Sequence, residues 1–272
     1  MCQSIEQATA QRLPGLVALS AARQSDRCEA VYFGLKLGDS DRDAIQTFDL
    51  KKRNYIGTTS MDAELSLVTA NMACVAPGGL VYDPFVGTGS FLYGAAHFGG
   101  TAMGSDIDGR QVRGKKKGKS VKGNFEQYGL SGRYLDGFVS DLTNTPLRKT
   151  RFLDAVICDP PYGVREGLKV LGSRDPAKEK EPVLVGGVMG HLLKDYIPPK
   201  KPYGFEAMLD DILQFSADSL VEDGRLAFWM PTANEGFQEE LDIPTHPQMK
   251  LVAACVQEFN KCMGIFTLTE QC

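Results

Sequence analysis

Four strand-like runs in this chain each end on an aspartate, and this repetition constrains the fold more than any other feature. The runs and their terminal acids occupy residues 80–83, 101–106, 135–141 and 153–159. Parallel strands present their carboxyl ends at one edge of a sheet, where open α/β sheets bind ligands. A helix cap after a strand explains one such acid, but it explains four poorly. The pattern therefore predicts a doubly wound, mostly parallel α/β sheet with Asp83, Asp106, Asp141 and Asp159 at one edge.

The remaining segments fit the same architecture, because strands and helices alternate along the chain. Further strands are expected at 31–35, 225–231 and 251–256. Helices are expected at 39–48, from an N-cap at Ser60, at 90–98, in a weak Lys- and Gly-rich stretch after Asp108, and at 205–220. Residues 163–203 form a long irregular insertion, and loops of that length in compact domains are usually functional or disordered.

The first acid leads into a glycine turn, Asp83-Pro84-Phe85-Val86-Gly87-Thr88-Gly89-Ser90-Phe91. A turn of this kind between a strand and a helix lets a nucleotide-like cofactor approach the backbone closely. A glycine pair alone is commonplace. It gains weight from the second motif and from the order in which the two occur.

The second motif is Asp159-Pro160-Pro161-Tyr162 followed by Gly163, again after an apolar run. An exocyclic amine of a nucleobase is a poor nucleophile, since its lone pair is delocalised into the ring. Asp159 and the carbonyl of Pro160 can accept its two hydrogens and so orient the lone pair. Pro161 stiffens the turn, and Tyr162 can stack on a displaced base. Together the two motifs predict methyl transfer from S-adenosylmethionine to such an amine.

The other acids suit the parts of this cofactor. Asp106 is expected to accept hydrogen bonds from the ribose diol, with Asp108 as the alternative. Asp141 is expected to face the adenine amine, with Leu142 beside it. Asp83 is expected near the ammonium group, and Gly87 and Gly89 beneath the methionine moiety. The predicted cofactor site also includes Thr59, Ser60, Phe85, Thr88 and Ile107.

The overall charge gives little help in binding a long nucleic acid. The 272 residues carry a formal net charge of −4, whereas proteins that hold nucleic acid alone usually present a basic face. A local basic cluster runs from Arg110 to Lys122, which is either a solvated surface or a phosphate contact. The expected substrate-binding residues are Lys115, Lys116, Arg165, Lys200 and Lys201.

Cysteine and histidine usage indicates a reducing compartment and no metal site. The seven cysteines include no Cys-x-x-Cys pair, and the three histidines are far apart in the sequence. The first residues lack the basic and apolar segments of a signal peptide, and no apolar run is long enough to span a membrane. A cytoplasmic protein without membrane contact is therefore expected.

Several motifs together resemble one family, the catalytic subunits of the eukaryotic tRNA guanine-10 N2-methyltransferases. The resemblance extends from about residue 31 to Lys261 and is carried by residues 57–65, 83–91, 104–109, 159–166, 195–198 and 228–234. It implies a class I S-adenosylmethionine-dependent, Rossmann-like methyltransferase fold and transfer to the N2 amine of guanosine-10 in tRNA. It also implies a small zinc-binding activator subunit as partner and a THUMP-type RNA-binding module ahead of the catalytic domain.

The two ends of the chain depart from that family. Residues 1–30 are too short for such a module, so they are expected to be a leader or the remnant of one, with the methyltransferase domain at 31–272. After Lys261 the sequence differs from the family, and the sheet is expected to lack its closing strand. Two alternatives stay open: a DNA or RNA adenine-N6 methyltransferase, and a non-catalytic fragment that binds the activator subunit.

Overall fold

The computed structural model describes residues 16–20, 31–35, 40–114, 116, 118–162, 168–173, 183–193, 196–231, 243–257 and 263–270. By its internal contacts the chain divides into two compact units, Met1–Ala44 and Ile45–Cys272. In the first unit, β1 (Leu16–Ser20) pairs antiparallel with β2 (Val31–Leu35). The strand expected at 31–35 is confirmed, but it belongs to this small sheet and not to the central one.

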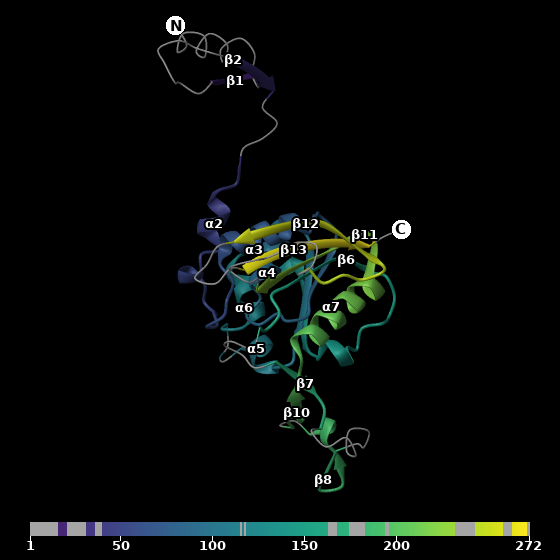
Figure 1. The fold of residues 1–272 in the computed structure, drawn as a ribbon. Helices are drawn as coiled ribbons and strands as arrows, with labels where there is room; N and C mark the ends of the chain where they lie inside the picture. Colours follow the sequence, from purple (N-terminus) through teal and green to yellow (C-terminus); the bar gives the residue numbers. More distant parts are fainter. Residues whose placement is uncertain are drawn as a thin grey trace. The chain divides into compact units, whose positions relative to one another are not determined.

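The second unit is built on a seven-stranded sheet with the order β12-β13-β11-β6-β3-β4-β5 (Figure 1). Its strands are β3 (Leu80–Asp83), β4 (Thr101–Asp106), β5 (Tyr134–Val139), β6 (Leu153–Cys158), β11 (Leu220–Pro231), β12 (Met249–Gln257) and β13 (Met263–Glu270). The five strands from β11 to β5 run parallel, and β13 is antiparallel to both of its neighbours. The mostly parallel sheet predicted from the sequence is confirmed.

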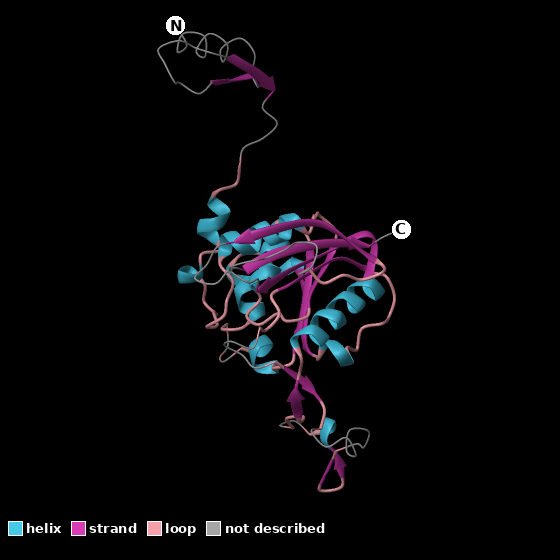
Figure 2. Cartoon of the chain, in the orientation of Figure 1, coloured by secondary structure: helices cyan, strands magenta, loops and turns pink. Residues whose placement is uncertain are grey.

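Helices cover both faces of this sheet (Figure 2). The helices of the described chain are α2 (Asp43–Thr47), α3 (Ala63–Met72), α4 (Ser90–His97), α5 (Gly109–Arg113), α6 (Val121–Gln127) and α7 (Phe205–Ser219), with short 3-10 turns at Leu50–Lys52, Ser131–Arg133, Leu142–Asn144 and Gly190–Leu192. On one face, α3 and α4 pack on small residues of β6 and β11 around Trp229. None of the helices in the described part of the chain is long and apolar enough to cross a membrane.

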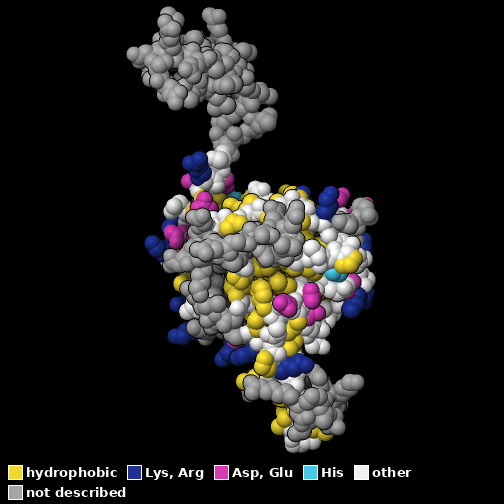
Figure 3. Space-filling model, in the orientation of Figure 1, with side chains coloured by type: hydrophobic (Ala, Val, Ile, Leu, Met, Phe, Trp, Pro, Cys, Tyr) yellow, Lys and Arg dark blue, Asp and Glu magenta, His cyan; other side chains and the backbone are white. Residues whose placement is uncertain are grey.

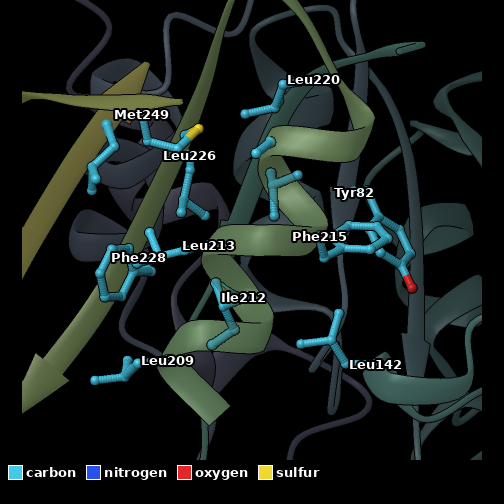
Figure 4. Close-up of a cluster of buried hydrophobic side chains, with 14 of the residues drawn as sticks. Tyr82, Leu142, Leu209, Ile212, Leu213, Phe215, Leu220, Leu226, Phe228 and Met249 are labelled. Carbon is cyan, nitrogen blue, oxygen red and sulfur yellow. The ribbon is translucent and has the colours of Figure 1, made fainter. Parts of the chain in front are cut away.

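The opposite face of the sheet is covered by α7. Leu209, Ile212, Leu213 and Phe215 on this helix meet apolar side chains of β3 and β11, including Tyr82 and Phe228 (Figure 4). Because strand residues alternate between faces, Val81 joins the α3–α4 cluster while Tyr82 joins the α7 cluster. The two cores fix the strand ends from which the four acids project.

The helix expected at 205–220 is confirmed as α7, which ends at Ser219, where β11 begins at Leu220. Two expectations about elements were wrong. The Lys- and Gly-rich stretch after Asp108 is not one helix, because Gly114 adopts φ +73° between α5 and α6. The sheet also does not lack a closing strand, since β13 inserts between β11 and β12 and pairs with both.

The insertion at 163–203 contains short paired strands among its described residues. β7 (Lys169–Leu171) pairs with β10 (Lys200–Pro202), and β8 (Leu184–Val185) pairs with β9 (Val188–Met189) through a Gly186-Gly187 turn. Side chains of the second hairpin are largely exposed, as they are at Leu184 and Val188. The first hairpin joins the insertion to the central sheet through contacts described below.

Candidate active site

The four acids predicted at one sheet edge lie there. Asp83 and Asp106 end the adjacent strands β3 and β4, Asp141 follows β5, and Asp159 follows β6. These four strands are consecutive neighbours and parallel, so their carboxyl ends share one edge. The spatial grouping that the sequence predicted is confirmed, whereas the role of each residue remains a prediction.

The glycine turn leads directly into α4 and has a conformation that favours glycine. Gly87 and Gly89 have φ of +49° and +88°, values that other residues rarely adopt. A Cβ on Gly89 would lie 2.7 Å from the Tyr93 hydroxyl. The turn is tied to β4 by the hydrogen bond from the Val86 N–H to the Ser105 carbonyl, 2.9 Å. This backbone can therefore approach a ligand at the amino end of α4.

Asp106 fastens the same turn to the end of β4. Its Oδ2 accepts from the Gly87 N–H at 3.0 Å, and its Oδ1 accepts from the Asp108 N–H at 2.7 Å. Asp108 is itself the N-cap of α5 and pairs with Arg110 at 2.6 Å, which lowers the pKa of Asp108. Of the two candidates for the ribose, Asp106 is the one that contacts the glycine turn.

Asp83 is fully buried beneath the turn. It accepts a hydrogen bond from the Phe85 N–H at 2.9 Å. Burial, together with the nearby charges of Asp106 and Asp159, raises the pKa of Asp83 well above its usual range. A cationic group next to Asp83 would favour its ionised form, which is the chemistry expected for a ligand ammonium.

Asp159 and Tyr162 hold polar atoms that are buried without a partner among the described residues. These are the Asp159 Oδ1 and the Tyr162 hydroxyl. Burial raises the pKa of Asp159 to about 7. Tyr162 packs its ring on the α3–α4 core cluster. Since buried polar atoms normally find partners, two such atoms in one short motif indicate a place for a polar ligand.

The Asp141 carboxylate accepts more hydrogen bonds from the protein itself than the sequence predicted. It accepts from the N–H and hydroxyl of Thr143 and also from the N–H of Leu171 in β7. Leu142 beside it is buried in the α7 core. The insertion therefore meets the end of β5 at this carboxylate.

Lys200 makes a second contact between the insertion and the predicted cofactor edge. Its Nζ donates to the carbonyl of Ile107 at 3.2 Å, just beyond β4. Lys200 was expected to bind substrate, and that role stays a prediction; in this structure its ammonium group lies at the predicted cofactor edge. Lys201 lies beside it in β10, and Lys116 is exposed between α5 and α6. Lys115 and Arg165 lie outside the described residues.

Ser60 was predicted to cap the following helix, and this was wrong. Asp62 is the N-cap of α3, accepting from the N–H groups of Glu64 and Leu65. The Ser60 hydroxyl accepts from the Gly57 N–H at 2.9 Å and lies 2.7 Å from the Thr88 hydroxyl. Ser60 thus reaches the glycine turn, and the neighbouring Thr59 lies in the same loop.

Sequence reasoning missed a set of residues behind the turn. They are Arg53, Tyr55 and Asn124, all three buried. The Asn124 side chain exchanges two hydrogen bonds with the backbone of Tyr55, and Arg53 donates to the Ser90 hydroxyl. An open pocket is lined by Tyr55, Asp108, Arg110, Gln111 and Gly114, next to the Asp106 side of the edge and not the Asp159 side. Burial and the charges of Asp106 and Asp108 raise the pKa of Tyr55. No sequence periodicity points to these residues. The one signal is the positive charge of Arg53 in a segment that is otherwise folded.

No group of three or more His, Cys, Asp or Glu side chains that could hold a metal ion occurs within the described ranges. Figure 3 shows Lys and Arg side chains scattered over the described surface of this view and not gathered into one broad patch.

Comparison with known proteins supports a methyltransferase. Residues 51–171 match the family model UPF0020, described as an RMKL-like methyltransferase domain. The chain is 51% identical to the tRNA (guanine(10)-N(2))-methyltransferase of Saccharomyces cerevisiae and 52% identical to that of Schizosaccharomyces pombe, in each case over 85% of this chain. The matches cover 54% and 47% of those proteins, so the chain spans about half the length of these curated relatives.

The solved structure of TrmN from Thermus thermophilus shares the fold. It is 17% identical, the match covers 89% of this chain and 57% of TrmN, and the TM-score is 0.52. With the mostly parallel sheet and helices on both faces, the fold is that of the class I methyltransferases.

Proposed function

This chain is a homologue of the tRNA (guanine(10)-N(2))-methyltransferases over 85% of its length, and we propose that it transfers a methyl group to the exocyclic N2 amine of guanosine-10 in tRNA. The observation that carries the proposal is the buried Asp159 carboxylate. Its Oδ1 has no hydrogen-bond partner among the residues that the structure describes, and it lies at the same sheet edge as the glycine turn. A hydrogen-bond acceptor at this position suits an amine nucleophile.

The cofactor is S-adenosylmethionine, which supplies the methyl group as an electrophile on its sulfonium sulfur. The residues present fit it. The positive-φ glycines open the backbone, Asp83 offers a buried negative charge to the ammonium, and Asp106 offers a carboxylate to the ribose diol. Phe85, Thr88, Ile107 and Leu142 lie around the same strand ends.

Asp159 acts on the amine and not on the cofactor. In its ionised form the carboxylate accepts a hydrogen bond from the amine, which draws electron density to nitrogen and fixes the lone pair. The Pro160 carbonyl can accept a hydrogen bond from the second N–H, and Pro161 lends stiffness to the turn. The ring of Tyr162 offers a stacking surface, and its hydroxyl, which has no partner among the described residues, can bond to a polar edge of the base.

Two partners belong to the proposal. The first is tRNA, the substrate named for the relatives. The second is a small zinc-binding activator subunit, which the resemblance implies. β5 is an edge strand of the sheet and exposes Leu135 and Val139, with 60% and 51% of their surfaces accessible. An apolar edge strand of this kind favours pairing with a strand of another chain.

The test is a transfer assay with methyl-labelled S-adenosylmethionine and the full chain co-expressed with the activator. The substrate is a tRNA transcript with guanosine at position 10. The matched control carries inosine there, because inosine lacks only the N2 amine. We expect label in the guanosine transcript and none above background in the inosine transcript. Equal labelling of the two, or none in either, would contradict the proposed function.

Two variants separate the roles within the site. We expect Asp106→Ala to weaken cofactor affinity by about 1.5–3 kcal/mol, the usual contribution of a hydrogen bond to a charged group. Asp159→Ala should bind the cofactor nearly as well as the unaltered chain and lose methyl transfer. Calorimetric titration with S-adenosylhomocysteine measures the first, and the labelling assay measures the second. Substantial turnover by Asp159→Ala would refute its role.

A further inference from the structure

Arg53 is a buried cation outside the set of residues discussed for the reaction. Only 6% of its surface is exposed, and it lies in the segment that precedes α3. Its guanidinium donates to three uncharged acceptors: the Phe48 carbonyl, the Tyr128 hydroxyl and the Ser90 hydroxyl, at 3.2, 3.1 and 2.7 Å. Burying a charge is costly unless its hydrogen bonds are satisfied. The contacts of Arg53 therefore indicate the structural role of this buried cation.

The shortest of these contacts reaches the start of α4. Ser90 is the first residue of this helix and directly follows Gly89 of the turn. The guanidinium carbon also lies 4.8 Å from the centre of the Tyr93 ring, a cation–π arrangement. Arg53 thus holds two points of the first turn of α4 at once.

Tyr93 carries the constraint to the turn itself. Its hydroxyl donates to the Thr88 carbonyl at 2.7 Å. A Cβ on Gly89 would lie 2.7 Å from the same hydroxyl, so the tyrosine packs closely against the turn. Burial raises the pKa of Tyr93 far above its usual range, so the hydroxyl keeps its proton and remains a donor.

Asn124 of α6 completes the network. Its side-chain amide donates to the Tyr93 hydroxyl at 3.0 Å. The same side chain donates to the Tyr55 carbonyl at 2.7 Å and accepts from the Tyr55 N–H at 3.0 Å. The segment that contains Arg53 and Tyr55 is therefore bonded to the turn from two directions. A buried polar network whose members are satisfied is rigid.

We infer that Arg53 and Tyr93 are positioning residues that preorganise the Gly87–Gly89 turn for the cofactor. The inference rests on the proposed function, since it takes this turn as the cofactor site. Neither side chain is assigned a contact with the cofactor. Their effect passes through Ser90 and the Thr88 carbonyl, and it fixes the backbone before the ligand arrives, which lowers the entropy that binding must remove.

The test uses the full chain and two conservative variants. Tyr93→Phe keeps the ring beneath the guanidinium but removes the bonds to Thr88 and Asn124. Arg53→Lys keeps the charge but removes the forked donor. The control is Arg225→Lys, because Arg225 also donates to a backbone carbonyl, that of Met72 at 3.1 Å, at the opposite end of α3. Thermal unfolding measures the stability of each protein.

Two readouts distinguish positioning from general stability. The first is the affinity for S-adenosylhomocysteine by calorimetry, and the second is amide hydrogen exchange of residues 86–90 in the free chain. We expect Tyr93→Phe to weaken affinity roughly three- to tenfold, the effect of one hydrogen bond, and to speed this exchange. Arg53→Lys should act in the same direction. Arg225→Lys should lower the melting temperature without changing either readout.

The outcomes separate this inference from the proposed function. If the unaltered chain binds S-adenosylhomocysteine and both variants bind within twofold of it, with unchanged exchange at 86–90, the positioning role is wrong. If the unaltered chain itself does not bind, the assignment of the cofactor site fails, and this inference fails with it. Should Arg53→Lys not fold, Tyr93→Phe decides alone.

Discussion

Asp159 brings stability and function into conflict at a single residue. Its Oδ1 is buried without a partner among the described residues, and burial raises its pKa from 3.8 to about 7. The folded chain therefore holds a proton on this group that the unfolded chain releases. The contribution of Asp159 to stability is full below about pH 4 and is lost as the pH rises to about 7. The proposed reaction, in contrast, requires the ionised carboxylate as acceptor.

Asp159→Asn should accordingly be more stable than the unaltered chain at pH 8 and inactive in methyl transfer. A rise from 3.8 to about 7 corresponds to roughly 4 kcal/mol. Because the amide must also be desolvated, we expect about half of that, roughly 2 kcal/mol. The gain should shrink towards zero near pH 4. Urea unfolding at several pH values measures it. The substitution also removes the contribution of the Asp159 charge to the raised pKa of Asp83. A stability difference independent of pH would contradict this account.

Single residues also show what sequence could predict about the site. The positions of Asp83, Asp106, Asp141 and Asp159 were predicted correctly, because a strand end is fixed by local pattern and the parallel sheet brings strand ends together. The partners of Ser60 and Lys200 were not. Each reaches a group far away in the chain, Thr88 and Ile107, and such contacts depend on how loops cross the sheet edge.

At the scale of elements, the strands near the site were easier to predict than their neighbours. β3, β4 and β6 are buried apolar runs with clear ends, so pattern alone locates them. The break between α5 and α6 depends on Gly114, where a Cβ would lie 1.8 Å from the Lys119 carbonyl oxygen. The place of β13 between β11 and β12 is a tertiary pairing, which no local pattern determines.

The exposed edge strand β5 yields a prediction about assembly. If the activator subunit covers this edge, Leu135→Glu should abolish its co-purification, because the substitution puts a charge on an apolar contact. The matched control is Val252→Glu on β12, the opposite edge strand, where the side chain is 43% exposed. Affinity purification of the co-expressed pair measures the result. Retained pairing in Leu135→Glu, or equal loss in both variants, would remove β5 as the docking edge.

At the scale of the whole molecule, charge limits what the chain can do with RNA alone. The net charge is −4, and the lysines considered for phosphate binding are two adjacent pairs, Lys115–Lys116 and Lys200–Lys201. Lys200 is held at the Ile107 carbonyl, while Lys116 is exposed beyond α5. The chain spans about half of its relatives' length.

The last prediction is therefore that this chain binds tRNA weakly and with strong dependence on salt. With about three phosphate contacts, affinity should fall roughly 20- to 40-fold between 50 and 200 mM salt. Lys116→Gln should weaken binding at low salt and make that dependence shallower by about one contact. Lys149→Gln is the control. Lys149 precedes β6 in the sequence, so it lies towards the amino ends of the parallel strands, away from the carboxyl ends that carry the four acids. Fluorescence anisotropy with labelled tRNA measures both. Tight binding at 200 mM salt by the monodisperse chain would show that charge is not what limits it, and that a surface other than the Lys116 region captures the RNA.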